Sequence, residues 1–201
     1  MIEPIIYRHL EPLARRLSPS HAGPLTWASL GIALCAAFAL AWSYQFPFLA
    51  AAGAILLVVH LLVNTLARIA AEQQGKAEPS WQLVSEFSDR MSDVAILLGL
   101  TFSPLVDKMV GLLVIICVLM VSYVGVLGQA LACQRIRIGV LGKAERTLLL
   151  AATCLLYAVD PQFDFRGYTA FGILFLVFIP LASLTLLQRL DRVLTLLNDR
   201  K

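Results

Sequence analysis

The sequence predicts an all-α integral membrane protein, with six transmembrane helices preceded by an N-terminal interfacial amphipathic helix. Of its 201 residues, 59% are hydrophobic and only 14% are charged, and the mean hydropathy is +0.81. A soluble domain carries more charge than this on its surface. Several uncharged runs also approach or exceed the about 18 apolar residues that a spanning helix needs. We therefore expect a single membrane domain over residues 1–201, and we find no signal for a nucleic-acid partner.

The first two elements are an interfacial segment and an uncharged span. In residues 1–22 the leucines and isoleucines fall near one side of a helix, and Arg8, Arg15 and Arg16 are available to lipid phosphates. The bundle of six helices then occupies residues 23–201. Its first span is expected at 25–42, followed by a short aromatic turn.

The remaining five helices follow from apolar runs and their breakers. The second begins near Leu49 and extends through Arg68, and a loop containing Gly75 and Pro79 ends it. The third has a polar first half, and Pro180 is expected to kink the last. The third to sixth helices are expected at 81–102, 109–133, 147–159 and 168–187.

The basic residues predict the orientation. If both termini are cytoplasmic, fourteen of the sixteen Lys and Arg residues lie on the cytoplasmic side, and only Lys108 and Arg166 lie outside. We therefore expect a bacterial plasma (inner) membrane location, with both termini and the functional site cytoplasmic. Gly125 and Gly128 form a small-residue face that could serve helix contacts within the bundle or in a homodimer.

Two polar stripes indicate where function lies. Each consists of residues four apart, so that each lines one helical face. The stripes are His60, Asn64 and Arg68 in the second helix, and Ser85, Asp89 and Asp93 in the third. Facing stripes would form a hydrophilic cleft open to the cytoplasm, where the two acids could hold Mg²⁺ or one could act as a general base. Alternatively, the acids pair with Arg68 and Arg90 at headgroup level and join the two helices.

The stripes resemble the signature of the CDP-alcohol phosphatidyltransferases, Asp-x2-Asp-Gly-x2-Ala-Arg-x8-Gly-x3-Asp-x3-Asp. Ala67 and Arg68 match its Ala-Arg pair, and Asp89 and Asp93 match its last two acids with the same spacing. Three further segments are similar to family sequences, so the resemblance covers nearly the whole chain. They are GPLTWASLGI, SYVGVLGQAL and LGKAERTLLL.

The resemblance implies a phospholipid-biosynthesis transferase that moves a phosphatidyl-type group from a CDP-linked lipid to an alcohol and releases CMP. Divalent ions, Mg²⁺ or Mn²⁺, would lie on the pyrophosphate, with Asp89 and Asp93 as metal ligands and Asp93 also as the catalytic base. Arg68 would lie near the phosphate or cytidine. The other candidate substrate-binding residues are Asn64, His60, Ser85, Lys143 and Arg146. The last two belong to a basic loop that could bind a phosphate or simply set the topology.

The departures from the signature weaken the metal site. His60 replaces its first acid, Val63 its second and Asn64 its first glycine. Ser85 replaces the second glycine, and sixteen residues rather than eight separate it from Arg68. Valine cannot ligate a metal, and imidazole suits transition metals better than Mg²⁺. Glu86 or Glu72 could substitute for a lost acid.

Three functions remain open from the sequence. The chain is a divergent transferase, or a catalytically inactive relative that binds lipid or nucleotide, or an assembly partner of another membrane protein. The transferase is favoured by Arg68, Asp89 and Asp93, and the inactive relative by the loss of acids at positions 60 and 63.

Overall fold

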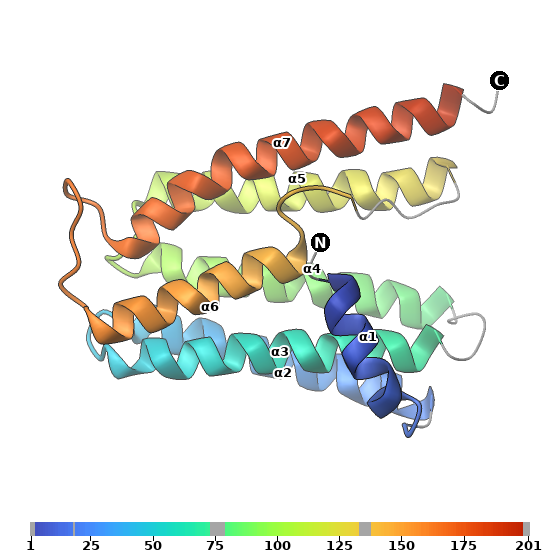
Figure 1. The fold of residues 1–201 in the computed structure, drawn as a ribbon, viewed down its shortest axis with the longest axis horizontal. Helices are drawn as coiled ribbons and strands as arrows, with labels where there is room; N and C mark the ends of the chain where they lie inside the picture. Colours follow the sequence, from blue (N-terminus) through green and yellow to red (C-terminus); the bar gives the residue numbers. More distant parts are fainter. Residues whose placement is uncertain (1–2, 18, 73–78, 133–137, 199–201) are drawn as a thin grey trace.

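The protein is a bundle of long helices with one short helix lying across it (Figure 1). The computed structural model describes residues 3–17, 19–72, 79–132 and 138–198. The all-α prediction is confirmed over these ranges. The elements are α1 (Glu3–Ala14), a 3-10 turn η1 (Pro19–His21), α2 (Ala22–Trp42), α3 (Phe48–Glu72), α4 (Pro79–Phe102), α5 (Lys108–Ala132), α6 (Lys143–Val159) and α7 (Ala170–Asn198).

All six predicted bundle helices are present. The prediction that each of them is an apolar span is confirmed only in part. In the described ranges, α2, α3, α5 and α7 are long and apolar enough to cross a membrane. The helix α6 has only 17 residues, and the first half of α4 is polar. The polar residues Ser85, Asp89 and Asp93 of α4 are buried inside the protein, so they do not face lipid.

The largest differences from the predicted helix boundaries lie at three helix ends. The N-terminal helix ends at Ala14 rather than at residue 22, and a short 3-10 helix follows at Pro19–His21. The helix α6 begins at Lys143, four residues earlier than expected. The last helix continues beyond residue 187 to Asn198, with Pro180 inside it, and its added part buries Val193 against Val124 of α5.

The core lies between the helices, and two of them, α2 and α4, pack unusually close together. Phe171, Phe175 and Phe178 of α7 are fully buried. At the contact of α4 with α2, a Cβ on Gly99 would lie 2.3 Å from the carbonyl oxygen of Ala37. Only glycine allows this approach, which fixes the position of α4 and therefore of its acids.

The segment that leads into α6 is fixed by α7. The backbone N–H of Leu141 donates to Thr185 Oγ1 at 2.9 Å, and Arg189 Nε donates to the carbonyl of Ile138 at 2.9 Å. Gly139 has a φ of +136° and a Cβ there would collide with Thr185. These contacts determine where α6 starts and which way its first turn faces.

Candidate functional site

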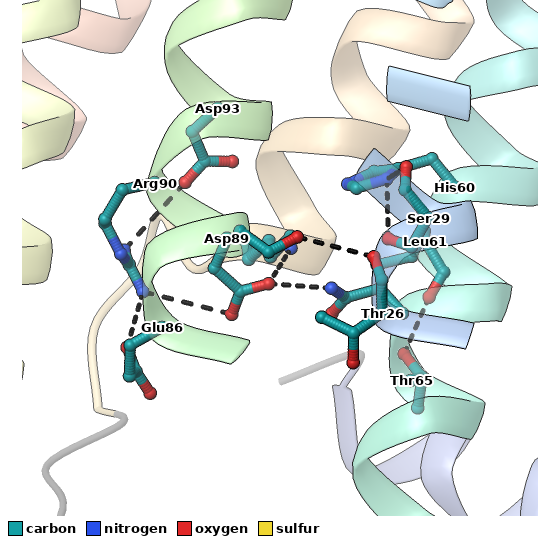
Figure 2. A network of polar contacts seen from close by, with 12 residues as sticks. Thr26, Ser29, His60, Leu61, Thr65, Glu86, Asp89, Arg90 and Asp93 are labelled. Carbon is teal, nitrogen blue, oxygen red and sulfur yellow. Dashed lines mark hydrogen bonds and ion pairs between the residues drawn. The ribbon is translucent and has the colours of Figure 1, made fainter. Parts of the chain in front are cut away.

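The two predicted polar stripes face each other in the structure. All six of their residues are buried, with exposed fractions of 9% or less. The stripes meet where Asn64 Nδ2 of α3 donates to Asp89 Oδ1 of α4 at 2.7 Å. Figure 2 shows Asp89 and Asp93 on one face of α4, with the residues of α3 opposite Asp89. Ser85 is buried one turn before Asp89 on the same face.

Each of the two acids pairs with a basic side chain from a third helix, α6. Lys143 Nζ donates to Asp89 Oδ1 at 2.7 Å, and a guanidinium nitrogen of Arg146 lies 2.7 Å from Asp93 Oδ2. The side chains in the second pair are only 6% and 5% exposed. The shortest ion pairs of the acids thus join α4 to α6.

Arg90 contributes more distant contacts from α4 itself. Its guanidinium nitrogens lie 4.0 Å from Asp89 Oδ2 and 3.9 Å from Asp93 Oδ2, and one of them lies 3.1 Å from Glu86 Oε2 (Figure 2). Of the two cations in the predicted alternative, Arg68 and Arg90, the structure places Arg90 near both acids, but the nearest cations are Lys143 and Arg146 of α6. Asp89 and Asp93 therefore face basic side chains rather than the predicted cytoplasm-open cleft.

His60 is held by α2. It is fully buried, and its Nδ1 lies 2.9 Å from the carbonyl oxygen of Ser29 and 3.1 Å from Ser29 Oγ (Figure 2). The carbonyl can only accept, so Nδ1 carries the hydrogen in this contact. Nε2 is then an acceptor, and it has no hydrogen-bond partner within the described part of the chain. His60 thus connects α3 to α2.

A small cleft lies beside Asp89, beneath α1. Its polar lining comes from Asn64, Thr65, Arg68 and Lys143, and its apolar lining from Ile6, Leu61 and Ala144. Basic, amide and hydroxyl donors here lie next to aliphatic side chains. This combination suits a ligand with a phosphate group and an apolar part.

The N-terminal helix is fastened next to this cleft by one hydrogen bond. Tyr7 Oη donates to Glu72 Oε2 at 2.5 Å and so ties α1 to the end of α3. Partial burial and this bond raise the pKa of Tyr7 from 10.0 to about 12. Tyr7 is therefore protonated, and able to donate, throughout the physiological range.

The residues present do not fit a pair of divalent ions. Among the described residues, no three His, Cys, Asp or Glu side chains are grouped so that they could hold a metal. Of the two substitute acids, Glu86 pairs with Arg90 and Glu72 accepts the bond from Tyr7. The network around α4 joins three carboxylates, Glu86, Asp89 and Asp93, to three cations, Arg90, Lys143 and Arg146. Among the described residues, these six groups carry no net charge, so they hold no excess negative charge for a divalent ion.

The sequence identified the acids but not their partners. Lys143 and Arg146 were expected in a loop ahead of a helix starting at residue 147, whereas they lie in the first turn of α6. Their spacing of three, directly after Gly142, was the available signal for one helical face. Ser29 was missed, because a lone serine in an apolar span carries no such signal.

The fold is similar to that of solved phosphatidylinositol phosphate synthase structures. The structure matches the phosphatidylinositol phosphate synthase of Mycobacterium tuberculosis in complex with manganese and citrate, with a TM-score of 0.69, 20% identity and coverage of 97% of this chain and 90% of that one. The same synthase with CDP-DAG bound gives a TM-score of 0.67 at 19% identity, covering 96% and 93%. This protein is therefore an all-α membrane protein with the phosphatidylinositol phosphate synthase fold.

Sequence comparison leads to the family. The chain is 27% identical over 162 residues to the archaetidylinositol phosphate synthase of Methanothermobacter thermautotrophicus, covering 80% of this chain and 79% of that protein. It is 26% identical over 163 residues to the inner membrane protein YnbA of Escherichia coli K12, covering 80% and 81%. No protein-family model matches the chain. The chain is a relative of the CDP-alcohol phosphatidyltransferase family, which confirms the resemblance seen in its sequence.

Proposed function

We propose that this protein binds a CDP-linked lipid at the cytoplasmic end of its bundle and does not transfer the lipid's phosphoryl group. The observation that carries the proposal is the pairing of both remaining motif acids, Asp89 with Lys143 and Asp93 with Arg146, each at 2.7 Å. These carboxylates are already neutralised by the chain's own cations. The two lost acids leave His60 and Val63, neither of which replaces a carboxylate ligand for Mg²⁺.

The cleft beneath α1 supplies groups for binding such a lipid. Arg68 and Lys143 present charged donors, and Asn64 presents an amide, all of which suit phosphate oxygens. Ile6 and Leu61 lie against the same cleft and suit an apolar part of the ligand. The Mycobacterium synthase, whose fold this chain shares, has been solved with CDP-DAG bound, which supports this class of ligand.

A working transferase is the second candidate. It is favoured by one observation, that Asp89 and Asp93 share a buried face of α4 while Arg68 lies on the facing helix, as the family motif requires. In that case Asp93 would have to leave Arg146 and accept the proton of the acceptor hydroxyl. The two candidates therefore differ in whether the ion pair opens when the ligand binds.

One experiment separates the two candidates. Purified protein in nanodiscs is given CDP-diacylglycerol, a panel of polyol and amino-alcohol acceptors, and Mg²⁺ or Mn²⁺ with a chelator control. Binding of the lipid and release of CMP are measured in parallel. We expect saturable binding without CMP release, and weaker binding by Arg68→Gln but not by the exposed control Arg192→Gln. CMP release that the chelator stops and that Asp93→Asn abolishes would establish the transferase instead.

A further inference from the structure

We propose that Lys143 and Arg146 are built-in cations that replace divalent metal ions at Asp89 and Asp93. The site would thus keep its structure without any metal. This inference does not rest on the proposed lipid binding, because its test reads metal binding and thermal stability rather than lipid or CMP.

The first argument is that Lys143 and a metal ion would compete for the same atom. The ammonium of Lys143 lies 2.7 Å from Asp89 Oδ1, which also accepts from Asn64 at 2.7 Å. A Mg²⁺ or Mn²⁺ ion on this oxygen would lie about 2.1 Å away and would be repelled by the ammonium beside it. One cation excludes the other.

The second argument is that the basic side chains occupy an unfavourable place on their own helix. Lys143 and Arg146 lie in the first turn of α6, where the helix dipole favours acidic side chains. Thr185 and Arg189 of α7 nevertheless fix the start of α6 so that both face α4. Their ion pairs with Asp89 and Asp93 offset this local cost, so the cations and the acids stabilise each other.

The third argument is that the site has lost acids while its basic side chains remain. Val63 and His60 stand where the family motif has acids, so the site lacks the negative charge that two divalent ions require. In the part of the chain that the structure describes, three carboxylates and three basic groups form one network whose charges balance. Two monovalent side chains need fewer carboxylates for charge balance than two divalent ions do. The site has two fewer acids than the family motif, at positions 60 and 63.

The test asks whether Mn²⁺ can take the place of a removed side chain. Melting temperature and Mn²⁺ binding, the latter by electron paramagnetic resonance, are measured in detergent for the wild type, Lys143→Gln, and Lys143→Gln combined with Val63→Asp. We expect the wild type to bind no Mn²⁺ saturably and to melt at the same temperature with Mn²⁺ or chelator. Lys143→Gln should melt lower, Mn²⁺ should restore most of that loss, and the added acid should tighten Mn²⁺ binding.

Arg189→Gln is the matched control. Arg189 also fastens two elements through its guanidinium, which donates to the backbone carbonyls of Ile138 and Val121. Its loss should lower the melting temperature with no recovery in Mn²⁺. Saturable Mn²⁺ binding by the wild type that Asp89→Asn removes would overturn the proposal, even if no Lys143 variant folds. Failure of Mn²⁺ to bind or stabilise either Lys143 variant would overturn it as well.

Discussion

Asp93 is a buried carboxylate with one guanidinium at 2.7 Å and a second at 3.9 Å. Its pairing with Arg146 joins α4 to α6 at a point where both side chains are about 95% covered. Removing one partner of such a pair strongly lowers the stability of the fold, because the remaining charge stays buried. The neighbouring pair of Lys143 with Asp89 follows the same logic, although Lys143 is somewhat more exposed.

At this scale we predict that Arg146→Gln lowers the free energy of unfolding by about 3–5 kcal/mol, the usual cost of stranding a buried charge. Adding Asp93→Asn should recover part of that loss, with a coupling of about 0.5–3 kcal/mol. Denaturant unfolding of the single and double variants in detergent gives both quantities.

Arg15→Gln is the control for this prediction. Arg15 also lies 2.8 Å from a carboxylate, that of Glu11, but its side chain is 72% exposed. Water screens this pair, so its removal should change stability by no more than about 1 kcal/mol. An Arg146→Gln variant as stable as Arg15→Gln would show that the buried pair contributes nothing.

At the scale of elements, α1 is attached to the bundle beside the cleft. Ile6 forms part of the cleft wall, and the bond from Tyr7 to Glu72 holds the helix against the end of α3. The elements that carry the acids are fixed differently, α4 by its close approach to α2 at Gly99 and α6 by the contacts of α7 with the segment before it. The two helices that carry the ion pairs are therefore fixed by their neighbours, and α1 covers one side of the site.

We predict that the attachment of α1 by Tyr7 persists through neutral and mildly alkaline pH. The folded-state pKa of Tyr7, about 12, lies above the value of 10.0 expected when it is free. Its contribution is therefore fully present below pH 10 and is lost as the pH rises through 12. The phenolate absorbance of the wild type minus that of Tyr7→Phe should show a midpoint near pH 12. Glu72→Gln should lower this midpoint, whereas a midpoint near pH 10 in the wild type would contradict the hydrogen bond.

At the scale of the whole molecule, the basic residues separate between the two ends of the bundle. Lys108 begins α5 and Arg166 lies in the loop between α6 and α7, at the end of the bundle opposite the ion-paired site (Figure 1). From this separation and the positive-inside rule, we expect the site end to face the cytoplasm.

We predict that this orientation appears in labelling with a membrane-impermeant maleimide. In a background with the four native cysteines replaced, Gln162→Cys in the loop between α6 and α7 should react in intact cells. Arg192→Cys near the end of α7 should react only after permeabilisation, since this end of the bundle would be cytoplasmic. Both positions are exposed, so accessibility within the protein does not decide the result. The reverse pattern would place the site outside.

The sequence alone was sufficient to predict that each helix exists, because its presence depends on local composition and on the breakers beside it. It also placed His60, Asn64 and Arg68 on one helical face and Ser85, Asp89 and Asp93 on another, since a helical face depends only on spacing. The family relationship followed from the same residues, and the comparisons confirm it. The end of α7 could not be placed in this way, because residues 188–198 are polar enough to leave the bundle and their helix depends on contacts of Arg189 and Val193.

The partners of the acids were decided by the tertiary structure. Lys143 lies 54 residues from Asp89 along the chain, and no sequence pattern shows which cation a buried acid will meet. That choice depends on where α7 holds the start of α6 and on how closely α4 approaches α2. Local spacing therefore determined the fold class and the motif. The counter-ions of Asp89 and Asp93 were set by long-range packing, because a charge pair requires two helices to be placed within hydrogen-bond distance.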